Sequence, residues 1–92
     1  MVREREYSPN QLKNTIEKGG IGVIANGPNT AEMCDFLGHV GFDAAFVDFE
    51  HGKVSWSELA DISRACELWG MSSVVRVNRL DEAQILRALD QG

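Results

Sequence analysis

The chain has 92 residues, a formal net charge of −5 and 43% hydrophobic residues, which is typical of one small globular domain. The acidic charge argues against a nucleic-acid partner, because such binding depends on Lys and Arg neutralising phosphates. No apolar stretch is long enough to cross a bilayer, and the charged start of the chain does not resemble a secretory signal. We therefore expect a cytoplasmic protein with no membrane partner.

The first half of the chain predicts a helix, a strand, a second helix and a second strand. Ser8 has the type and spacing of a helix cap, and Asn29 has those of a second cap. Gly41 is placed to end the second helix in a left-handed conformation. The expected elements are a helix over 9–18, a strand over 21–25, a helix over 30–40 and a strand over 44–47.

The second half repeats this alternation. Ser55 and Glu58 are spaced as a capping box for a helix that Gly70 ends. A strand is expected over 73–77, and Asp81 is expected to open a last helix after a short loop. The chain therefore predicts an N-terminal helix followed by three strand–helix units.

Alternating strands and helices favour a parallel sheet covered by helices. Three strands alone leave both edges of such a sheet open and one of its faces without a partner. A TIM (β/α)8 barrel needs eight units and about 250 residues. The expected fold class is thus α/β: the first three β-α units, with an N-terminal helix, of a TIM barrel that is incomplete as given. Residues 1–92 would form the N-terminal part of a single β/α-barrel domain.

Three ionisable residues follow the apolar strand at 44–47, namely Asp48, Glu50 and His51. Side chains alternate along a strand, so Asp48 and Glu50 are expected on one face and His51 on the other. In α/β folds the carboxyl ends of strands are where catalytic groups gather. His51 is therefore a candidate base, with an unperturbed pKa of about 6.5.

Arg76 follows two Val residues at the end of the third expected strand. A guanidinium there requires a carboxylate, because an unpaired buried charge is costly. That carboxylate is either a substrate or a structural partner, Asp48 or Glu50, and the sequence leaves both open.

The other residues with chemical potential have structural interpretations. Cys34 and Cys66 lack CxxC or zinc-site spacing, so we expect buried, reduced thiols. His39 lies just before the end of a helix, where a cation suits the helix dipole. Trp56 and Trp69 are interpreted as packing or subunit contacts.

The chain resembles the HpcH/HpaI aldolases, which are class II, metal-dependent pyruvate aldolases such as 4-hydroxy-2-oxoheptanedioate or 2-dehydro-3-deoxyglucarate aldolase. The resemblance runs from about Leu12 to Gly92. The segments that carry it are Gly41-Phe42-Asp43, the strand at 44–47, Asp48-Phe49-Glu50-His51-Gly52, Val75-Arg76-Val77 and Leu89-Asp90-Gln91-Gly92. It implies a lyase that cleaves a 4-hydroxy-2-oxo acid to pyruvate, or a similar 2-oxo acid, and an aldehyde through a metal-stabilised enolate.

The resemblance also implies roles for individual residues. His51 would be the general base, and Arg76 would stabilise the negative charge on the 2-oxo oxygen. Asp90 would raise the basicity of the His. Asp48 and Glu50 would lie around the base and the water shell of the metal.

The resemblance further implies a divalent metal (Mg, Mn or Co) and a homo-oligomer. Its metal ligands, one Glu and one Asp, would lie C-terminal to Gly92, so none is expected in this chain. Asp90 ends a helix antiparallel to the strands and should lie at the opposite mouth of the barrel. Contact with His51 would then need a neighbouring subunit or an unusual loop path, and both remain open.

Three alternatives remain. One is an enzyme of the citrate-lyase or malyl-CoA-lyase type, although that branch tends to carry an Asp-rich element in place of Glu-His-Gly. Another is an inactive three-unit barrel fragment that self-associates, and the 92-residue chain alone is expected to be inactive. A nucleotide-binding module is disfavoured, because neither GxGxxG nor GxxxxGK[ST] follows the first strand.

Overall fold

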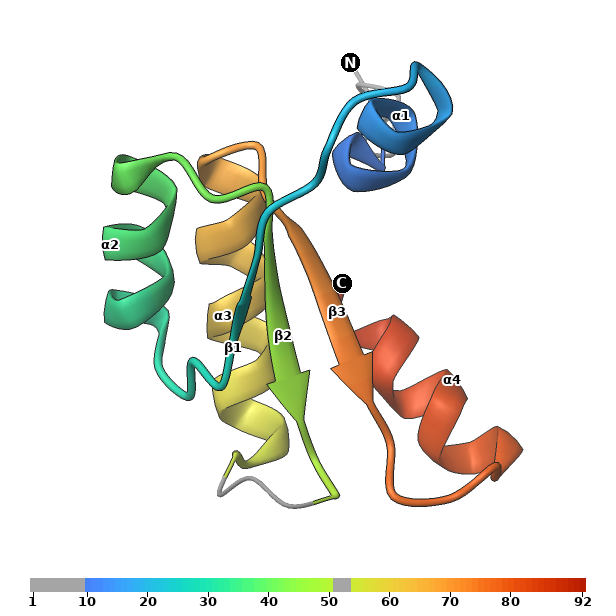
Figure 1. Cartoon of the computed structure of the whole chain (residues 1–92). Coiled ribbons are helices and arrows are strands. Elements are labelled where there is room, and N and C mark those ends of the chain that lie inside the picture. The colour runs from blue at the N-terminus through green and yellow to red at the C-terminus, as the bar shows by residue number, and fades with distance from the viewer. Residues whose placement is uncertain (1–9, 51–53) are drawn as a thin grey trace, which may run out of the picture.

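The computed structural model describes residues 10–50 and 54–92. Three parallel strands in the order β1-β2-β3 form one sheet with four helices (Figure 1). In chain order the elements are α1 (Gln11–Glu17), β1 (Ile24–Asn26), α2 (Ala31–Val40), β2 (Ala44–Asp48), α3 (Trp56–Leu68), β3 (Ser72–Arg76) and α4 (Glu82–Asp90). The α/β prediction is confirmed.

Helix caps explain where the helices begin. Ser55 caps α3, as expected, by accepting a hydrogen bond from Glu58 N at 3.3 Å, and Asp81 caps α4. The cap of α2 is Thr30, whose Oγ1 accepts from Met33 N at 3.1 Å. The prediction of Asn29 was one residue early, because both residues can cap and the sequence does not say which adopts the extended conformation.

The first helix and two strands also begin at different residues from those expected. Asn10 caps α1 by accepting from Lys13 N at 3.0 Å, whereas the expected cap, Ser8, lies outside the described residues. Strand β1 begins at Ile24 because pairing with β2 begins at Ala44. Residues 21–23 are therefore apolar but outside the ladder, and β3 covers 72–76 instead of 73–77.

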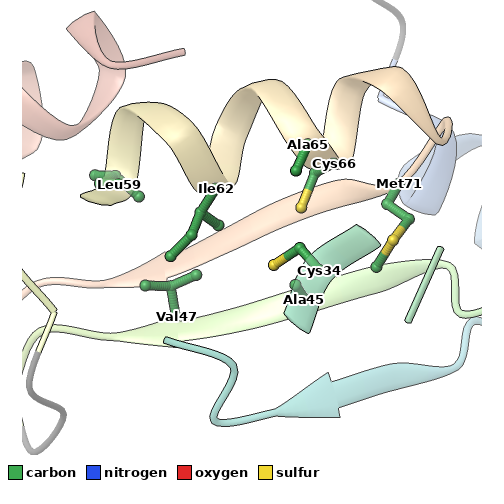
Figure 2. Packing of buried hydrophobic residues seen from close by; sticks show 8 residues of the cluster. All are labelled: Cys34, Ala45, Val47, Leu59, Ile62, Ala65, Cys66 and Met71. Carbon is green, nitrogen blue, oxygen red and sulfur yellow. The ribbon is translucent and has the colours of Figure 1, made fainter. Parts of the chain in front are cut away.

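The hydrophobic core lies between the sheet and helices α2 and α3, which pack side by side (Figures 1 and 2). Its buried members are Cys34, Ala45, Val47, Leu59, Ile62, Ala65, Cys66 and Met71. Ala45 and Val47 alternate with Phe46 and Asp48 along β2, so the latter pair points to the other face of the sheet. In a closed β/α barrel that face lines the interior.

No helix in the described part of the chain has both the length and the apolar character needed to cross a membrane.

Candidate active site

The carboxyl ends of the strands bring polar side chains together at one edge of the sheet. β1 ends at Asn26, β2 at Asp48 and β3 at Arg76. The parallel register pairs Asp48 directly with Arg76, so both side chains leave the same face at the same level. The convergence of these two residues, which the sequence left open, follows from strand length and register.

Arg76 is held by two carboxylates. Its Nε donates to Asp48 Oδ1 at 3.0 Å, and its Nη2 contacts Asp48 Oδ2, which gives a two-pronged ion pair. Its Nε also lies 3.4 Å from Glu50 Oε2. The guanidinium is 43% exposed and the Asp48 side chain 17%, so the carboxylate is largely covered while the cation still faces solvent.

The same contacts raise the pKa of Arg76. The hydrogen bond with Asp48 is the main cause, and the negative charges of Asp48 and Glu50 add to it, against a smaller opposing effect of burial. Arg76 therefore stays a cation at any pH at which the protein is folded.

The backbone just after β2 fixes the positions of both carboxylates. Asp48 Oδ1 accepts a hydrogen bond from Glu50 N at 2.8 Å, which turns the chain at the end of the strand. Phe49 N donates to Arg76 O at 2.9 Å and extends the pairing of the two strands by one residue. The Arg76 guanidinium also lies 5.8 Å from the centroid of the Phe46 ring, on the same face of the sheet.

An aromatic stack lies beside this group. The rings of Phe49 and Trp56 are stacked with centroids 4.7 Å apart and 25° between their planes, and the Arg87 guanidinium lies 4.5 Å from the Trp56 ring. Trp56 does make a packing contact, as expected. No local pattern in the sequence indicates a role for Arg87, because its contact depends on how α4 folds back beside α3.

The other expected site residues are placed differently. His51 lies outside the described residues. Asp90 ends α4, which runs back from the carboxyl edge, and Gly92 lines a pocket of about 320 Å³ with Ser72 and Ser73 at the start of β3. The C-terminus accordingly lies well above the tips of the strands in Figure 1. Asp90 is thus on the side away from Arg76.

The remaining histidine and the cysteines occupy structural positions. The rings of His39 and Trp69 meet edge to face at 5.9 Å. Cys34 and Cys66 are free thiols, 0% and 1% exposed, and their sulfur atoms face each other in the core (Figure 2). A hydrogen bond with Cys34, together with burial, raises the pKa of Cys66.

The described residues do not form a metal site of their own. Within residues 10–50 and 54–92 no three His, Cys, Asp or Glu side chains gather closely enough to hold an ion. The carboxylates of Asp48 and Glu50 are both engaged with Arg76.

Known proteins are similar to this chain in sequence and in fold. It is 36% identical over 81 residues to a 2-dehydro-3,6-dideoxy-6-sulfogluconate aldolase of Pseudomonas putida, a match that covers 88% of this chain and 31% of that enzyme. The crystal structure of an HpcH/HpaI aldolase from Desulfitobacterium hafniense DCB-2 superposes with a TM-score of 0.77 and 26% identity, over 88% of this chain and 32% of the other. That of the citrate synthase SbnG gives 0.78 and 27%, over 91% and 35%. No family model matches the chain.

The fold and its carboxyl-edge site thus define part of a β/α barrel, because the structural neighbours extend the same three units into much longer chains. In sequence and fold the chain corresponds to the N-terminal part of the HpcH/HpaI aldolases. It spans about a third of the length of the relatives it matches.

Proposed function

We propose that this chain supplies the base and the oxyanion-binding arginine of a lyase that cleaves a 4-hydroxy-2-oxo acid to pyruvate, or a similar 2-oxo acid, and an aldehyde. The observation that carries the proposal is the Arg76–Asp48 ion pair at the carboxyl edge of a parallel sheet. The similarity to two enzymes described as aldolases supports this reaction class. The residues expected to do the chemistry are His51, Arg76 and Asp90.

Arg76 suits the stabilisation of negative charge. Among the described residues, the carboxylates that contact Arg76 use its Nε and Nη2. Its Nη1 edge is then available to the 2-oxo oxygen, where charge develops as the carbon–carbon bond breaks. A donor already held in place costs no reorganisation at that moment, and Asp48 and Glu50 serve to hold it.

His51 would move the proton. In the cleavage direction the 4-hydroxyl loses a proton, and a positioned base of near-neutral pKa typically contributes about 10²- to 10⁴-fold. A divalent cation bound by residues beyond this chain would supply Lewis-acid polarisation of the 2-oxo and carboxylate oxygens. Asp90 would act on the His51 of a neighbouring subunit, so we also expect a homo-oligomer. Its expected location is the cytoplasm.

The test is pyruvate release from 4-hydroxy-2-oxo acids by the longest product of the gene that encodes this chain, with Mg²⁺ or Mn²⁺ added or removed by chelation. We expect metal-dependent release that falls by about 10²-fold or more in His51→Ala. His39→Ala is the matched control, because His39 lies on α2, contacts Trp69 at the end of α3 and should not affect turnover. Full activity of His51→Ala would rule out His51 as the base.

A second candidate is a citrate-lyase or malyl-CoA-lyase type of enzyme, which the similarity to the citrate synthase SbnG favours. It predicts turnover of a coenzyme A thioester or of citrate under conditions in which 4-hydroxy-2-oxo acids are left intact. The fragment alternative predicts that the 92-residue chain elutes as an oligomer without lyase activity under any metal.

A further inference from the structure

We propose that Trp56 and Arg87 are positioning residues for Arg76, and that they act through the aromatic stack formed by Phe49, Trp56 and Arg87. The inference rests on the proposed function for its catalytic meaning, but the contacts that carry it are independent of the reaction. Neither Trp56 nor Arg87 lies at the end of a strand, so neither is expected to touch substrate.

The stack joins three elements that are separate in sequence. Phe49 directly follows β2, Trp56 is the first residue of α3, and Arg87 lies in the last turns of α4. Phe49 and Trp56 both pack against the buried core cluster. A stacked aromatic pair contributes beyond its buried area, and a cation over the indole face adds to this.

Phe49 connects this stack to the candidate site. It lies between Asp48 and Glu50, the two carboxylates that hold the Arg76 guanidinium, and its amide donates to Arg76 O at 2.9 Å. A shift of the Phe49 ring therefore moves both carboxylates and the end of β3 together. Losing the ring of Trp56 removes the contact that fixes Phe49 from the core side.

Arg87 extends the link to α4. This helix has no fully buried residue: Ala88 packs against the core cluster, and the contact of Arg87 with Trp56 adds to what holds the helix in place. Arg87 is exposed, and the indole face that it covers would otherwise face solvent more openly. We therefore expect Arg87 to tighten the stack without being needed for folding.

The direct readout is hydrogen exchange of the Arg76 Nε–H, followed by NMR in the longest product of the gene that encodes this chain. A carboxylate acceptor at 3.0 Å should protect this proton in the wild type. In Trp56→Leu we expect exchange to be about fivefold faster, which is the factor for a stack worth about 1 kcal/mol. Trp56→Phe, which keeps an aromatic ring, should restore most of the protection.

Matched variants separate an effect on the position of Arg76 from a general loss of stability of the fold. Trp69→Phe changes the other tryptophan, which contacts Asp35 and His39, and should leave Arg76 unaffected. Amide exchange at the buried Ile62 reports on the core in every variant. Unchanged Nε–H exchange in Trp56→Leu with an intact core would overturn the proposal. If Trp56→Leu does not fold, the test is made with Arg87→Gln. We expect faster exchange of the Arg76 Nε–H in this variant, and exchange at the wild-type rate would contradict the proposal.

An activity measurement distinguishes this inference from the proposed function. In an active longer protein, Trp56→Leu should lower kcat by about tenfold with little change in KM, since misplacement of a catalytic group slows the chemical step more than binding. A wild type without lyase activity would refute the proposed function, yet the Nε–H exchange would still test the stack. Trp56→Leu could also keep the full kcat while its Nε–H exchanges faster. That result would show that the stack positions Arg76 without serving catalysis, and would overturn the catalytic role of the stack.

Discussion

At the residue scale, Asp48 decides where the Arg76 guanidinium points. Its Oδ1 accepts hydrogen bonds from Arg76 Nε at 3.0 Å and from Glu50 N at 2.8 Å. One side chain therefore holds both the guanidinium and the turn that follows the strand. The sequence left open whether the carboxylate partner of Arg76 is a substrate or a neighbour. The structure shows the neighbour: within residues 10–50 and 54–92, Asp48 and Glu50 contact the guanidinium.

This arrangement predicts the effect of Asp48→Asn in the active protein. The substitution keeps the shape but removes the charge, so Arg76 loses its strongest acceptor and kcat should fall by at least about tenfold. Asp61→Asn is the matched control, since Asp61 pairs with Arg64 on the exposed surface of α3 at 2.7 Å. Equal kcat values for the two variants, measured with saturating substrate, would contradict a role for Asp48.

The buried thiol pair predicts a pH dependence of stability. The raised pKa of Cys66 means that the folded state keeps a proton that the unfolded state releases above about pH 8.5. Through Cys66, the free energy of unfolding should therefore decrease as the pH rises above about 8.5, by up to about 1.4 kcal/mol per pH unit. Urea unfolding at several pH values measures this slope. Cys66→Ala should reduce it, and an identical slope in the variant would contradict the assignment.

At the element scale, the order and type of the secondary structure could be predicted, whereas the exact ends could not. Periodicity and caps identified every helix and strand, including Ser55 and Asp81 as caps. Strand β1 shows why the ends differ: Ile21 and Val23 are as apolar as strand residues, but only residues 24–26 are in register with residues of β2. Pairing is a tertiary property, and a local apolar pattern does not contain it.

The close contact of α2 with α3 predicts the effect of Gly38→Ala. A Cβ at Gly38 would lie 2.4 Å from Trp69 Cγ and 2.5 Å from Trp69 Cβ, which are near the backbone and cannot swing away. We expect the free energy of unfolding to fall by about 1–3 kcal/mol, as for other overpacked sites. In a Trp69→Ala background the same change should be neutral, or stabilise by about 0.5–1 kcal/mol because Ala favours a helix. Urea unfolding measures this free energy. An equal decrease in both backgrounds would contradict a clash between residue 38 and Trp69.

At the scale of the whole molecule, the chain exposes much apolar surface for its size. The side chains of Leu80, Ile21 and Leu68 are 98%, 86% and 79% exposed, and both outer strands of the sheet have an open edge. Apolar side chains exposed to this extent at several places are expected to meet a partner. We expect that partner to be further strand–helix units of a barrel, in line with the greater length of the structural neighbours.

The candidate site was predictable in part, and for a geometric reason. Asp48 and Arg76 end neighbouring parallel strands, so their meeting follows from sequence order and register. The antiparallel run of α4 likewise predicted that Asp90 lies away from them. The link from Arg87 through Trp56 to Phe49 could not be predicted, because it depends on how three elements pack and on no local pattern.

The most direct measurement is the exchange of the pyruvate methyl protons for deuterium, followed by NMR in D₂O with the longest product of the gene. It isolates proton transfer beside the 2-oxo group and does not require the aldehyde to be known. We predict metal-dependent exchange that is lost in His51→Ala and reduced by about 10²-fold or more in Arg76→Ala. Arg64→Ala, at an exposed ion pair of α3, should exchange as the wild type does. Wild-type exchange rates in Arg76→Ala, or rapid exchange that is insensitive to metal removal, would contradict the proposed role of this chain.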